Sequence, residues 1–522
     1  MPPSTRHRRF AAAFAGLLGI STPILALVAT STPASAVRAS AHPCDPGQHV
    51  AGSVKFPSAS WKVCIGGNIT QSSPATLNYE GRTLVAVGDE NGELNLFDGA
   101  TGKELPGWPE KMAAPRGEHA AIESSPSFAF FDGPNKPPAI VSTSGSTWVK
   151  NSIGEVEAFH LDGAKRFVFR VGAATGTAVG VVDSPAVGAL SGHGRPDILF
   201  GSWDHLIYAL DGHGRMVPGF PMNNADTIWS SPAIYHLPGA TGMDFIIGSD
   251  ASGFHGCTGG FITDYRYSAG APHLIWQHCI SQVVWSSPAI GNFGNKANPV
   301  VVVGTGYYRQ PFPASTNKIY AYDARSGTAL PGWPVTTSGP VYGSPAIGDL
   351  KGDGSSSVVD VSWKCTTGQQ KSCFGSNTST VAAWSASGHQ EWSQDLLGPT
   401  ALGSPILVPL QNSIANDVLV GTPNAMYPLD GTNGNPLFGT NPTNPYASIN
   451  PGCRVFDTPA VADVVQGVSD LGWHVFEACG GPPTFKFPGE VASYPLPSTP
   501  LSAGWSQFHA GADHTGVAAA TF

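Results

Sequence analysis

Eight times along this chain, at regular intervals, a Ser-Pro or Thr-Pro step opens a short apolar run. Neighbouring steps are 47 to 60 residues apart. The steps are Ser73-Pro74, Ser125-Pro126, Ser184-Pro185, Ser231-Pro232, Ser287-Pro288, Ser344-Pro345, Ser404-Pro405 and Thr458-Pro459. A unit of this length has the size of one β-propeller blade, and it must stack on copies of itself to bury its apolar face. The repeat therefore predicts an all-β fold, a single eight-bladed β-propeller with four-stranded blades.

The third repeat illustrates the predicted strands. Its runs at Asp197–Gly201 and Leu206–Leu210 are rich in β-branched and aromatic residues, and turns containing Gly and Asp flank them. Proline has no N–H to give to a strand ladder, so the repeated proline should mark where the first strand begins. The last repeat lacks a fourth strand of its own, and either residues 59–66 or residues 505–508 can supply it. Such pairing would close the ring and leave no free edge.

The N-terminus carries an export signal. Three arginines precede an apolar stretch that ends in Ala34-Ser35-Ala36, so residues 1–36 are predicted to be a signal peptide and the protein to be secreted. We divide the remainder into an N-terminal extension at 37–58, the propeller at 59–517 and a C-terminal tail at 518–522.

Charge and hydropathy limit the partners. Ser21, Thr22 and Pro23 interrupt the apolar stretch, which argues against a membrane span. Without the three arginines of the signal the net charge is about −12, which argues against nucleic acid as a partner. We expect a monomer that binds an extracellular glycan or protein.

All eight cysteines follow the predicted signal peptide, and an even number in an exported chain indicates disulfides. Many pairings are formally possible. Pairing in sequence order keeps every bridge local. This gives Cys44 with Cys64, Cys257 with Cys279, Cys365 with Cys373, and Cys453 with Cys479.

Two repeat motifs resemble known families. The run at 344–354, Ser-Pro-Ala-Ile-Gly-Asp-Leu-Lys-Gly-Asp-Gly, resembles an FG-GAP or VCBS repeat. The Asp-x-x-x-Gly turns at 98–102 and 323–327, each followed by a Trp, resemble the quinoprotein-like (PQQ-like) propeller repeat. The ending at 505–516 is similar to a segment of secreted proteins that carry such repeats. The resemblance covers about residues 60–517 and implies a propeller fold, with activities that diverge within the group.

The resemblance raises two cofactors, a quinone and calcium. A quinone-dependent dehydrogenase of this group would need an adjacent Cys-Cys pair, which the sequence lacks, so a quinone is disfavoured and no cofactor is expected. Calcium needs six or more oxygen ligands from a tight turn, and only Asp349 and Asp353, with Asp360 beyond, approach that pattern. Lys351 stands where a ligand would be, and the residues favour a turn closed by its own side-chain hydrogen bonds.

The residues that precede each repeat proline define a candidate site. Three positions before the proline stand Gln71, Glu123, Val182, Trp229, Trp285, Tyr342, Leu402 and Phe456, and two positions before it stand the acidic Asp183 and Asp457. In a propeller these positions surround the axis, on the face that also carries the long and variable loops between the second and third strands. The sequence predicts a funnel with an aromatic arc and carboxylates, flanked by the loop residues Trp148, Tyr307, Tyr308 and Arg309. The alternative is that these bulky side chains only plug the channel.

Catalytic motifs are missing from the sequence. It contains no Gly-x-Ser-x-Gly elbow, no His-Glu-x-x-His and no phosphate-binding loop before a helix. The sequence therefore favours a secreted recognition propeller over an enzyme. The alternative is an extracellular carbohydrate-active hydrolase or lyase that uses Glu123, Asp183 and Asp457 as its carboxylates.

Overall fold

The computed structural model describes residues 57–146, 149–172, 180–250, 256–280, 282–293, 298–306, 317–365, 376–398, 402–411, 413–442, 449, 453–467, 469–481, 488–497 and 505–517. Within these residues the regular elements are the strands β1 to β31, and there is no α-helix. Nor do they contain any helix with the length and hydropathy needed to cross a membrane.

The strands form antiparallel sheets that follow one another along the chain. Five sheets have four strands, each paired with the next in sequence. The first three of these are β6 (Ser127–Ala129), β7 (Ala139–Thr143), β8 (Glu155–Phe159) and β9 (Lys165–Arg170); β10 (Ala186–Gly188), β11 (Asp197–Gly201), β12 (Leu206–Leu210) and β13 (Met222–Asn223); and β14 (Ala233–Tyr235), β15 (Met243–Gly248), β16 (Phe261–Ser268) and β17 (Ala271–Cys279). The other two are β18 (Ala289–Gly291), β19 (Val300–Gly304), β20 (Lys318–Asp323) and β21 (Val335–Thr336); and β22 (Ala346–Gly348), β23 (Ser357–Trp363), β24 (Thr378–Ser385) and β25 (Gln390–Leu397). A three-stranded sheet follows, with β26 (Ile406–Val408), β27 (Asp417–Thr422) and β28 (Ala425–Leu429).

An eight-stranded sheet joins the two ends of the chain. One half holds β2 (Ala75–Tyr79), β3 (Arg82–Gly88), β4 (Glu93–Asp98) and β5 (Glu110–Lys111), and the other holds β29 (Ala460–Gln466), β30 (Ser469–Cys479), β31 (Glu490–Pro495) and β1 (Trp61–Cys64). The single pair Gln466 with Arg82 connects the two halves. Strand β1 pairs with β31 from Trp61 opposite Ser493 to Cys64 opposite Glu490. Of the two segments that could complete the last repeat, the N-terminal one therefore does so.

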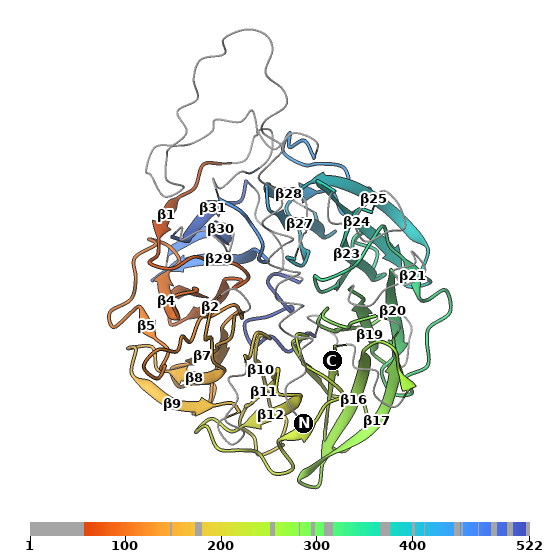
Figure 1. Cartoon of the computed structure of the whole chain (residues 1–522). Helices are drawn as coiled ribbons and strands as arrows, with labels where there is room; N and C mark the ends of the chain where they lie inside the picture. Colours follow the sequence, from red (N-terminus) through yellow and green to blue (C-terminus); the bar gives the residue numbers. More distant parts are fainter. Residues whose placement is uncertain are drawn as a thin grey trace.

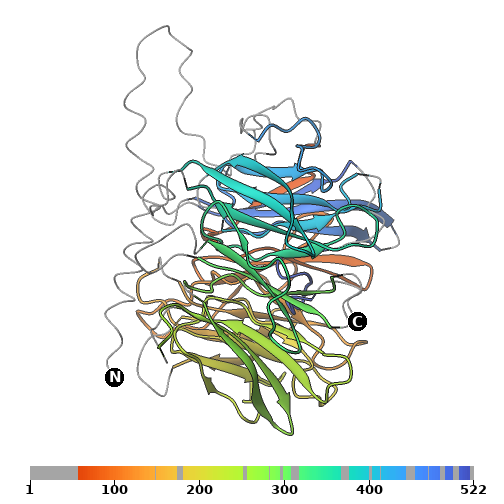
Figure 2. The same cartoon turned by 90° about the vertical axis from the view of Figure 1, so that its right-hand side faces the viewer.

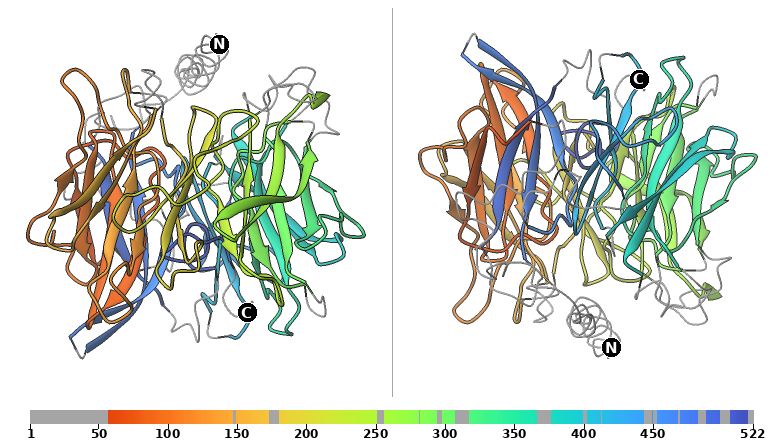
Figure 3. Two further views of the ribbon diagram at one scale, coloured as in Figure 1. Left: turned by 90° about the horizontal axis from the view of Figure 1, so that it is seen from below. Right: turned by 90° about the horizontal axis from the view of Figure 1, so that it is seen from above.

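The sheets stand around a common centre like the blades of a fan (Figure 1). Figures 2 and 3 show the same ring from the side. The strand that follows each repeat proline lies innermost, and all eight of these strands, β2, β6, β10, β14, β18, β22, β26 and β29, begin at the residue directly after the proline. The prediction that the proline marks the start of the first strand is confirmed. The first two residues of every inner strand are buried.

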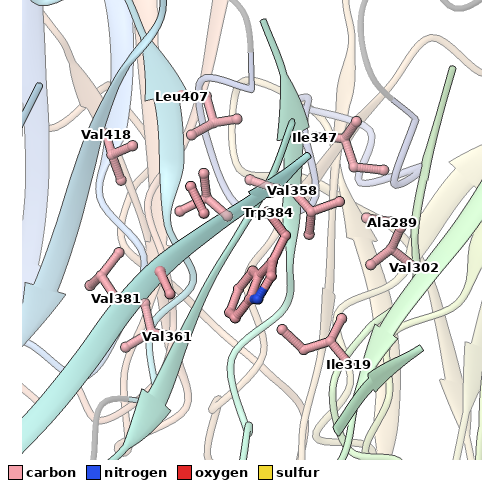
Figure 4. Packing of buried hydrophobic residues seen from close by; sticks show 14 of the residues in the cluster. Ala289, Val302, Ile319, Ile347, Val358, Val361, Val381, Trp384, Leu407 and Val418 are labelled. Carbon is pink, nitrogen blue, oxygen red and sulfur yellow. The ribbon is translucent and has the colours of Figure 1, made fainter. Parts of the chain in front are cut away.

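Apolar side chains fill the space between neighbouring sheets. Figure 4 shows one such layer, in which Ile319 and Val302 of one sheet meet Val358 and Trp384 of the next, with Leu407 of a third sheet beside them. All five side chains are at least nine-tenths buried. The core is thus a series of layers between sheets rather than one central core, as the stacking of repeats requires.

Tryptophans on outer strands bind the turns of the neighbouring repeat. In three cases the indole N–H donates to the carbonyl of a residue in an Asp-x-x-x-Gly turn, at 2.7–2.9 Å: Trp61 to Gly99, Trp276 to Ala324 and Trp392 to Gly431. The final glycine of each turn has a positive φ, and a Cβ there would lie 2.5–2.6 Å from the indole. Glycine is therefore needed at this position both for the backbone and for the close approach of the ring.

The C-terminal segment 505–517 lies in the middle of the ring, where it follows the inner strands (Figures 1 and 3). The residue two positions after the repeat proline donates its backbone N–H to this segment in seven repeats. The donors and acceptors are Leu407 to Trp505, Val461 to Ser506, Thr76 to the Gln507 side chain, Phe128 to Ala512, Val187 to Asp513, Ile234 to Thr515 and Ile290 to Gly516, all at 2.7–3.1 Å. The segment therefore satisfies the inner edges of the sheets, which would otherwise present unpaired donors.

Candidate functional site

A ring of hydroxyl groups surrounds the channel. The Ser or Thr before each repeat proline accepts, through its side-chain oxygen, the backbone N–H of the equivalent residue in the preceding repeat, at 2.8–3.0 Å. The last member, Thr458, donates to Ser73, the first. The eight hydrogen bonds therefore form a closed circle, which explains why a hydroxyl residue recurs before the proline.

A cavity of about 100 Å³ lies against this hydroxyl ring. All eight residues that stand three positions before a repeat proline line it, together with Asp457 and the eight hydroxyl residues. Phe508 of the C-terminal segment, half-buried, also lines it. The sequence spacing therefore brings these side chains together around one space, which the C-terminal segment closes on one side.

Aromatic rings form one wall of the cavity. Trp229, Trp285 and Tyr342 line the cavity, and Trp203 and Trp363 flank them outside the lining; the five rings form an arc with neighbouring centroids 4.7–5.1 Å apart. Trp229 and Trp285 are stacked at 20°, whereas the other pairs are tilted by 40–48°. Such contacts between rings hold each ring in place, so the wall is a rigid apolar surface.

Polar groups form the facing part of the wall. Gln71 donates from its side-chain amide to the carboxylate of Glu123 at 3.4 Å, and Asp457 follows on the other side of Gln71 in the ring of repeats. Glu123 is 2% exposed and is held in the cavity wall. The described residues that line the cavity include two acids and no Lys, Arg or His. The cavity therefore presents an aromatic side and an acidic side.

Asp183 does not belong to the cavity lining. Its carboxylate accepts the backbone N–H of Gly201 at 2.6 Å, behind the wall. Ser72 and Ser286, at the equivalent position of other repeats, accept from Gly88 and Gly304 in the same way. Burial raises the pKa of Asp183 well above its usual range. The structure thus separates Asp183 from the other predicted site residues and gives it a contact that a serine makes elsewhere.

Asp457 lies beside a second buried acid. Burial raises the pKa of both Asp457 and Glu477, and the negative charge of Asp457 raises the pKa of Glu477 further. Glu490 also raises the pKa of Glu477, while Lys62, which pairs with Glu490 at 2.7 Å, lowers it. Two neighbouring buried carboxyl groups cannot both ionise at low cost, so burial and mutual repulsion oppose loss of the second proton.

Two predicted disulfides are confirmed. Cys257 bonds to Cys279 and Cys453 to Cys479, each with 5.6 Å between the Cα atoms. Cys64 and Cys365 are also disulfide-bonded. Their predicted partners, Cys44 and Cys373, lie outside the described residues.

Both confirmed bridges lie at the cavity end of the sheets. Cys257 lies in the connection between β15 and β16, and Cys479 is the last residue of β30. In both repeats the second strand ends at the side where the inner strand begins, which is the cavity side. The bridges therefore tie down the connections around the cavity.

The predicted calcium turn is closed by its own hydrogen bonds. The Asp349 carboxylate accepts four backbone N–H groups, from Lys351 to Gly354, at 2.7–3.3 Å. Asp353 accepts from Ser355. Within the described residues one group of acidic, His and Cys side chains is close enough to share an ion, and two of its three members are the bonded Cys453 and Cys479. Calcium at Asp349 and Asp353 stays a prediction.

Four predicted loop residues, Trp148, Tyr307, Tyr308 and Arg309, lie outside the described residues. Conversely, sequence reasoning missed Trp203, Trp363 and Phe508. Trp203 follows the second strand of its repeat, and Trp363 ends the second strand of another repeat. An aromatic residue at the end of a second strand was therefore the sequence signal that could have identified these two tryptophans. Nothing in the local sequence indicates that Phe508 returns to the channel.

The chain is similar in structure to several solved propellers. BamB from Moraxella catarrhalis aligns with a TM-score of 0.52 and 12% identity, over 84% of this chain and 99% of that one. The quinohemoprotein alcohol dehydrogenase of Comamonas testosteroni gives 0.56 and 13%, over 86% and 78%. A europium-containing methanol dehydrogenase gives 0.55 and 11%, over 84% and 93%. No protein-family model and no curated protein matches the sequence. At these identities the likeness shows the fold alone, a β-propeller.

Proposed function

We propose that this chain is a secreted, eight-bladed β-propeller that binds an extracellular glycan or protein at its cavity. The count of eight rests on the hydroxyl ring and on the eight-stranded sheet. That sheet divides into two four-stranded halves connected by one residue pair, and each half carries one repeat proline. Export rests on the predicted signal at 1–36 and on the disulfides, which persist in oxidising compartments.

The observation that carries the proposal is the division of the cavity wall. A wall that only plugged the channel could use the same apolar residue in every repeat, yet the eight equivalent positions hold seven different residue types. Three aromatic residues of consecutive repeats, Trp229, Trp285 and Tyr342, gather on one side. The two acids belong to repeats on the other side, where Phe456 is the one aromatic residue of the repeats. A concave site with apolar walls and a few placed polar groups is the usual form of a ligand site. At about 100 Å³ this one would hold a single protruding group, such as one sugar substituent or one side chain.

A glycan and peptide array probed with the mature protein tests the proposal. Trp229 and Tyr342 are half-buried, and their joint replacement by Ala should abolish capture of any ligand that the wild type retains. Glu123→Gln keeps the shape of the side chain and should weaken the same capture. Leu274→Ala, on the outer strand β17 where Leu274 is 58% exposed, is the matched control and should leave it unchanged. Capture that survives both cavity changes would contradict the proposal.

The second candidate function is an extracellular hydrolase or lyase. The buried pair of Asp457 and Glu477 favours it, because burial raises the pKa of both carboxyl groups, and a carboxyl group with a raised pKa can act as a general acid. Glu123, in the cavity, would be the second carboxylate. Incubation of the mature protein with the captured glycan, followed by analysis of the products, tests this function. Turnover that disappears in Glu123→Gln while binding persists would establish it over pure recognition.

A quinone-dependent dehydrogenase activity is not proposed. Two of the structural neighbours are alcohol or methanol dehydrogenases by name, but their identity to this chain is 11–13%. The sequence has no adjacent pair of cysteines. The binding proposal therefore involves no cofactor.

A further inference from the structure

A second cavity, of about 390 Å³, lies between the sheets β6–β9 and β10–β13. Its walls are the turn after β10, the turn after β12 and the start of β9, which are the strand ends remote from the central cavity. Its volume falls within the range of small-molecule sites. Five basic residues line it: Arg166, His193, Arg195, His213 and Arg215. In a chain with a net charge of −9, this concentration of basic side chains is unusual.

Arg166 is the fixed element of this cleft. Its side chain is 9% exposed, and its guanidinium lies 5.3 Å from the centre of the Phe131 ring. Both terminal nitrogens bind the carboxylate of Asp132, at 2.6 and 2.9 Å, and Nε donates to the carbonyl of Gly212 at 2.5 Å. These contacts use three of the five guanidinium hydrogens. Arg166 is therefore held in one orientation, with two N–H groups for which the described residues supply no hydrogen-bond acceptor.

The acids that line the cleft are occupied by their own turns. Asp197 accepts the backbone N–H of Ser191 at 2.7 Å. Asp211 accepts the backbone N–H groups of His213 and Arg215 with one oxygen and the Arg215 guanidinium with the other. Their acceptor oxygens are thus directed into the turns. A ligand in the cleft meets few free acceptors.

Donors, in contrast, remain available. Arg195 makes one hydrogen bond among the described residues, from one terminal nitrogen to the carbonyl of Phe131 at 2.6 Å. His193 uses Nδ1 towards Ser191 at 2.9 Å, which leaves Nε2, and the imidazole of His213 makes no hydrogen bond within the described part of the chain. The open polar positions of the cleft are therefore mostly N–H groups on basic side chains.

We propose that this cleft binds an oxyanion, a carboxylate or a sulfate or phosphate ester, carried on a small organic scaffold. Guanidinium groups match the geometry of such anions, and charge-assisted hydrogen bonds to them are the stronger ones. Phe131, Met216 and Val217 supply apolar surface for the scaffold. The site is separate from the central cavity, so it stands whether or not the proposed recognition function is correct.

Calorimetric titration of the mature protein with glucuronate and with glucose tests the site. The two sugars differ in the carboxylate, so the site predicts measurable heat for glucuronate and none for glucose, at constant ionic strength set by NaCl. Inorganic sulfate and glucose 6-sulfate, titrated in parallel, distinguish a carboxylate from a sulfate ligand. The proposal would be overturned if glucose gave the same heat of binding as both anionic sugars. It would also be overturned if NaCl alone reproduced the heat seen with the anionic sugars, which would indicate an adventitious ion only.

Matched variants locate the binding. Arg195→Gln removes one exposed guanidinium and should weaken anion binding about tenfold, which is the value of one charge-assisted hydrogen bond. Arg82→Gln is the control, since Arg82 is an exposed, paired arginine of another sheet, and it should bind as the wild type does. Thermal unfolding of each variant without ligand verifies the fold. Unchanged affinity in a folded Arg195→Gln protein would refute the site.

Discussion

At one end of the central channel the wall consists of side chains that differ from repeat to repeat, whereas at the other end the same backbone group is used in seven repeats. The cavity end holds Gln, Glu, Val, Trp, Trp, Tyr, Leu and Phe at one equivalent position. The C-terminal segment 505–517 fills the other end of the channel, which we call the filled end. There the backbone N–H of the residue two positions after the repeat proline binds this segment in seven repeats. The hydroxyl ring lies between the two, and it is as uniform as the filled end.

The difference separates what stabilises the ring from what distinguishes its repeats. Backbone donors must be paired in every repeat, because an unpaired buried N–H destabilises the fold wherever it occurs. The cavity side chains carry no such common requirement, so each can take a different residue. Substitutions at the filled end should therefore affect stability most, and substitutions at the cavity end should affect binding most.

Removal of the C-terminal segment should have the largest effect. A chain that ends at residue 497 loses the acceptors of seven buried N–H groups, at a cost of roughly 1 kcal/mol or more each. The total, about 7 kcal/mol, is comparable to the whole stability of a typical domain. We expect circular dichroism to show an unfolded chain or a much lower melting temperature, while a chain that ends at residue 517 melts as the full chain does. A truncated protein with an unchanged melting temperature would show that the filled end is dispensable.

Buried titratable groups at the two ends of the channel should make the stability of the fold depend on pH in opposite directions. In the C-terminal segment, burial lowers the pKa of His509 to about 4 and that of His514 to about 3. The unfolded chain, with an ordinary histidine pKa near 6.5, then binds more protons, so stability falls as the pH drops below about 6.5. Asp183 behind the cavity has a raised pKa, so the folded state holds the proton more tightly and stability falls as the pH rises above about 4.

Two variants isolate these contributions. His514→Asn, in which Asn tolerates the positive φ of 52°, should reduce the loss of stability between pH 6.5 and 4, by up to about 1.4 kcal/mol per pH unit. Asp183→Asn should reduce the loss on the alkaline side and leave the acid side unchanged. Denaturant unfolding at pH 4.5, 6.5 and 8 measures both. A variant with the pH profile of the wild type would mean that its residue does not titrate on unfolding.

The sequence predicted where the inner strand of each repeat begins, because the same restriction on proline applies in every repeat. Proline can stand only where no ladder donor is needed, so its position marks the first residues of all eight inner strands. The side chains three positions before it could be predicted to surround one space for the same reason.

Other features could not be read from local sequence. Asp183 and Asp457 occupy the same repeat position, yet Asp457 lines the cavity and Asp183 binds Gly201 behind it. The direction of such a side chain depends on the groups that face it from a neighbouring strand, which are distant in sequence. The path of residues 505–517 was likewise hidden, because its partners are backbone donors of seven repeats and backbone donors leave no mark in the sequence.

The hydroxyl ring should show an intermediate effect. Ser231→Ala removes the acceptor of the buried Ser184 N–H, which should lower the free energy of unfolding by about 1–3 kcal/mol. Ser231→Thr keeps the acceptor, and Thr458 shows that threonine fits this position in another repeat. The threonine variant should therefore retain most of the stability. Equal losses in both variants, measured by denaturant unfolding, would indicate that packing rather than the hydrogen bond matters here.

Two valines of one repeat give the smallest and most direct comparison. Val182 is half-buried in the cavity wall, and Val187 is 3% exposed on β10, where its N–H binds Asp513. Replacement by Thr keeps the shape of either side chain and adds one hydroxyl. At Val187 the hydroxyl is buried among apolar groups, so stability should fall by about 1–3 kcal/mol. At Val182 it faces the cavity, so the change should stay within about 0.5 kcal/mol. If Val182→Thr destabilised the protein as much as Val187→Thr, the cavity wall would be core rather than a binding surface.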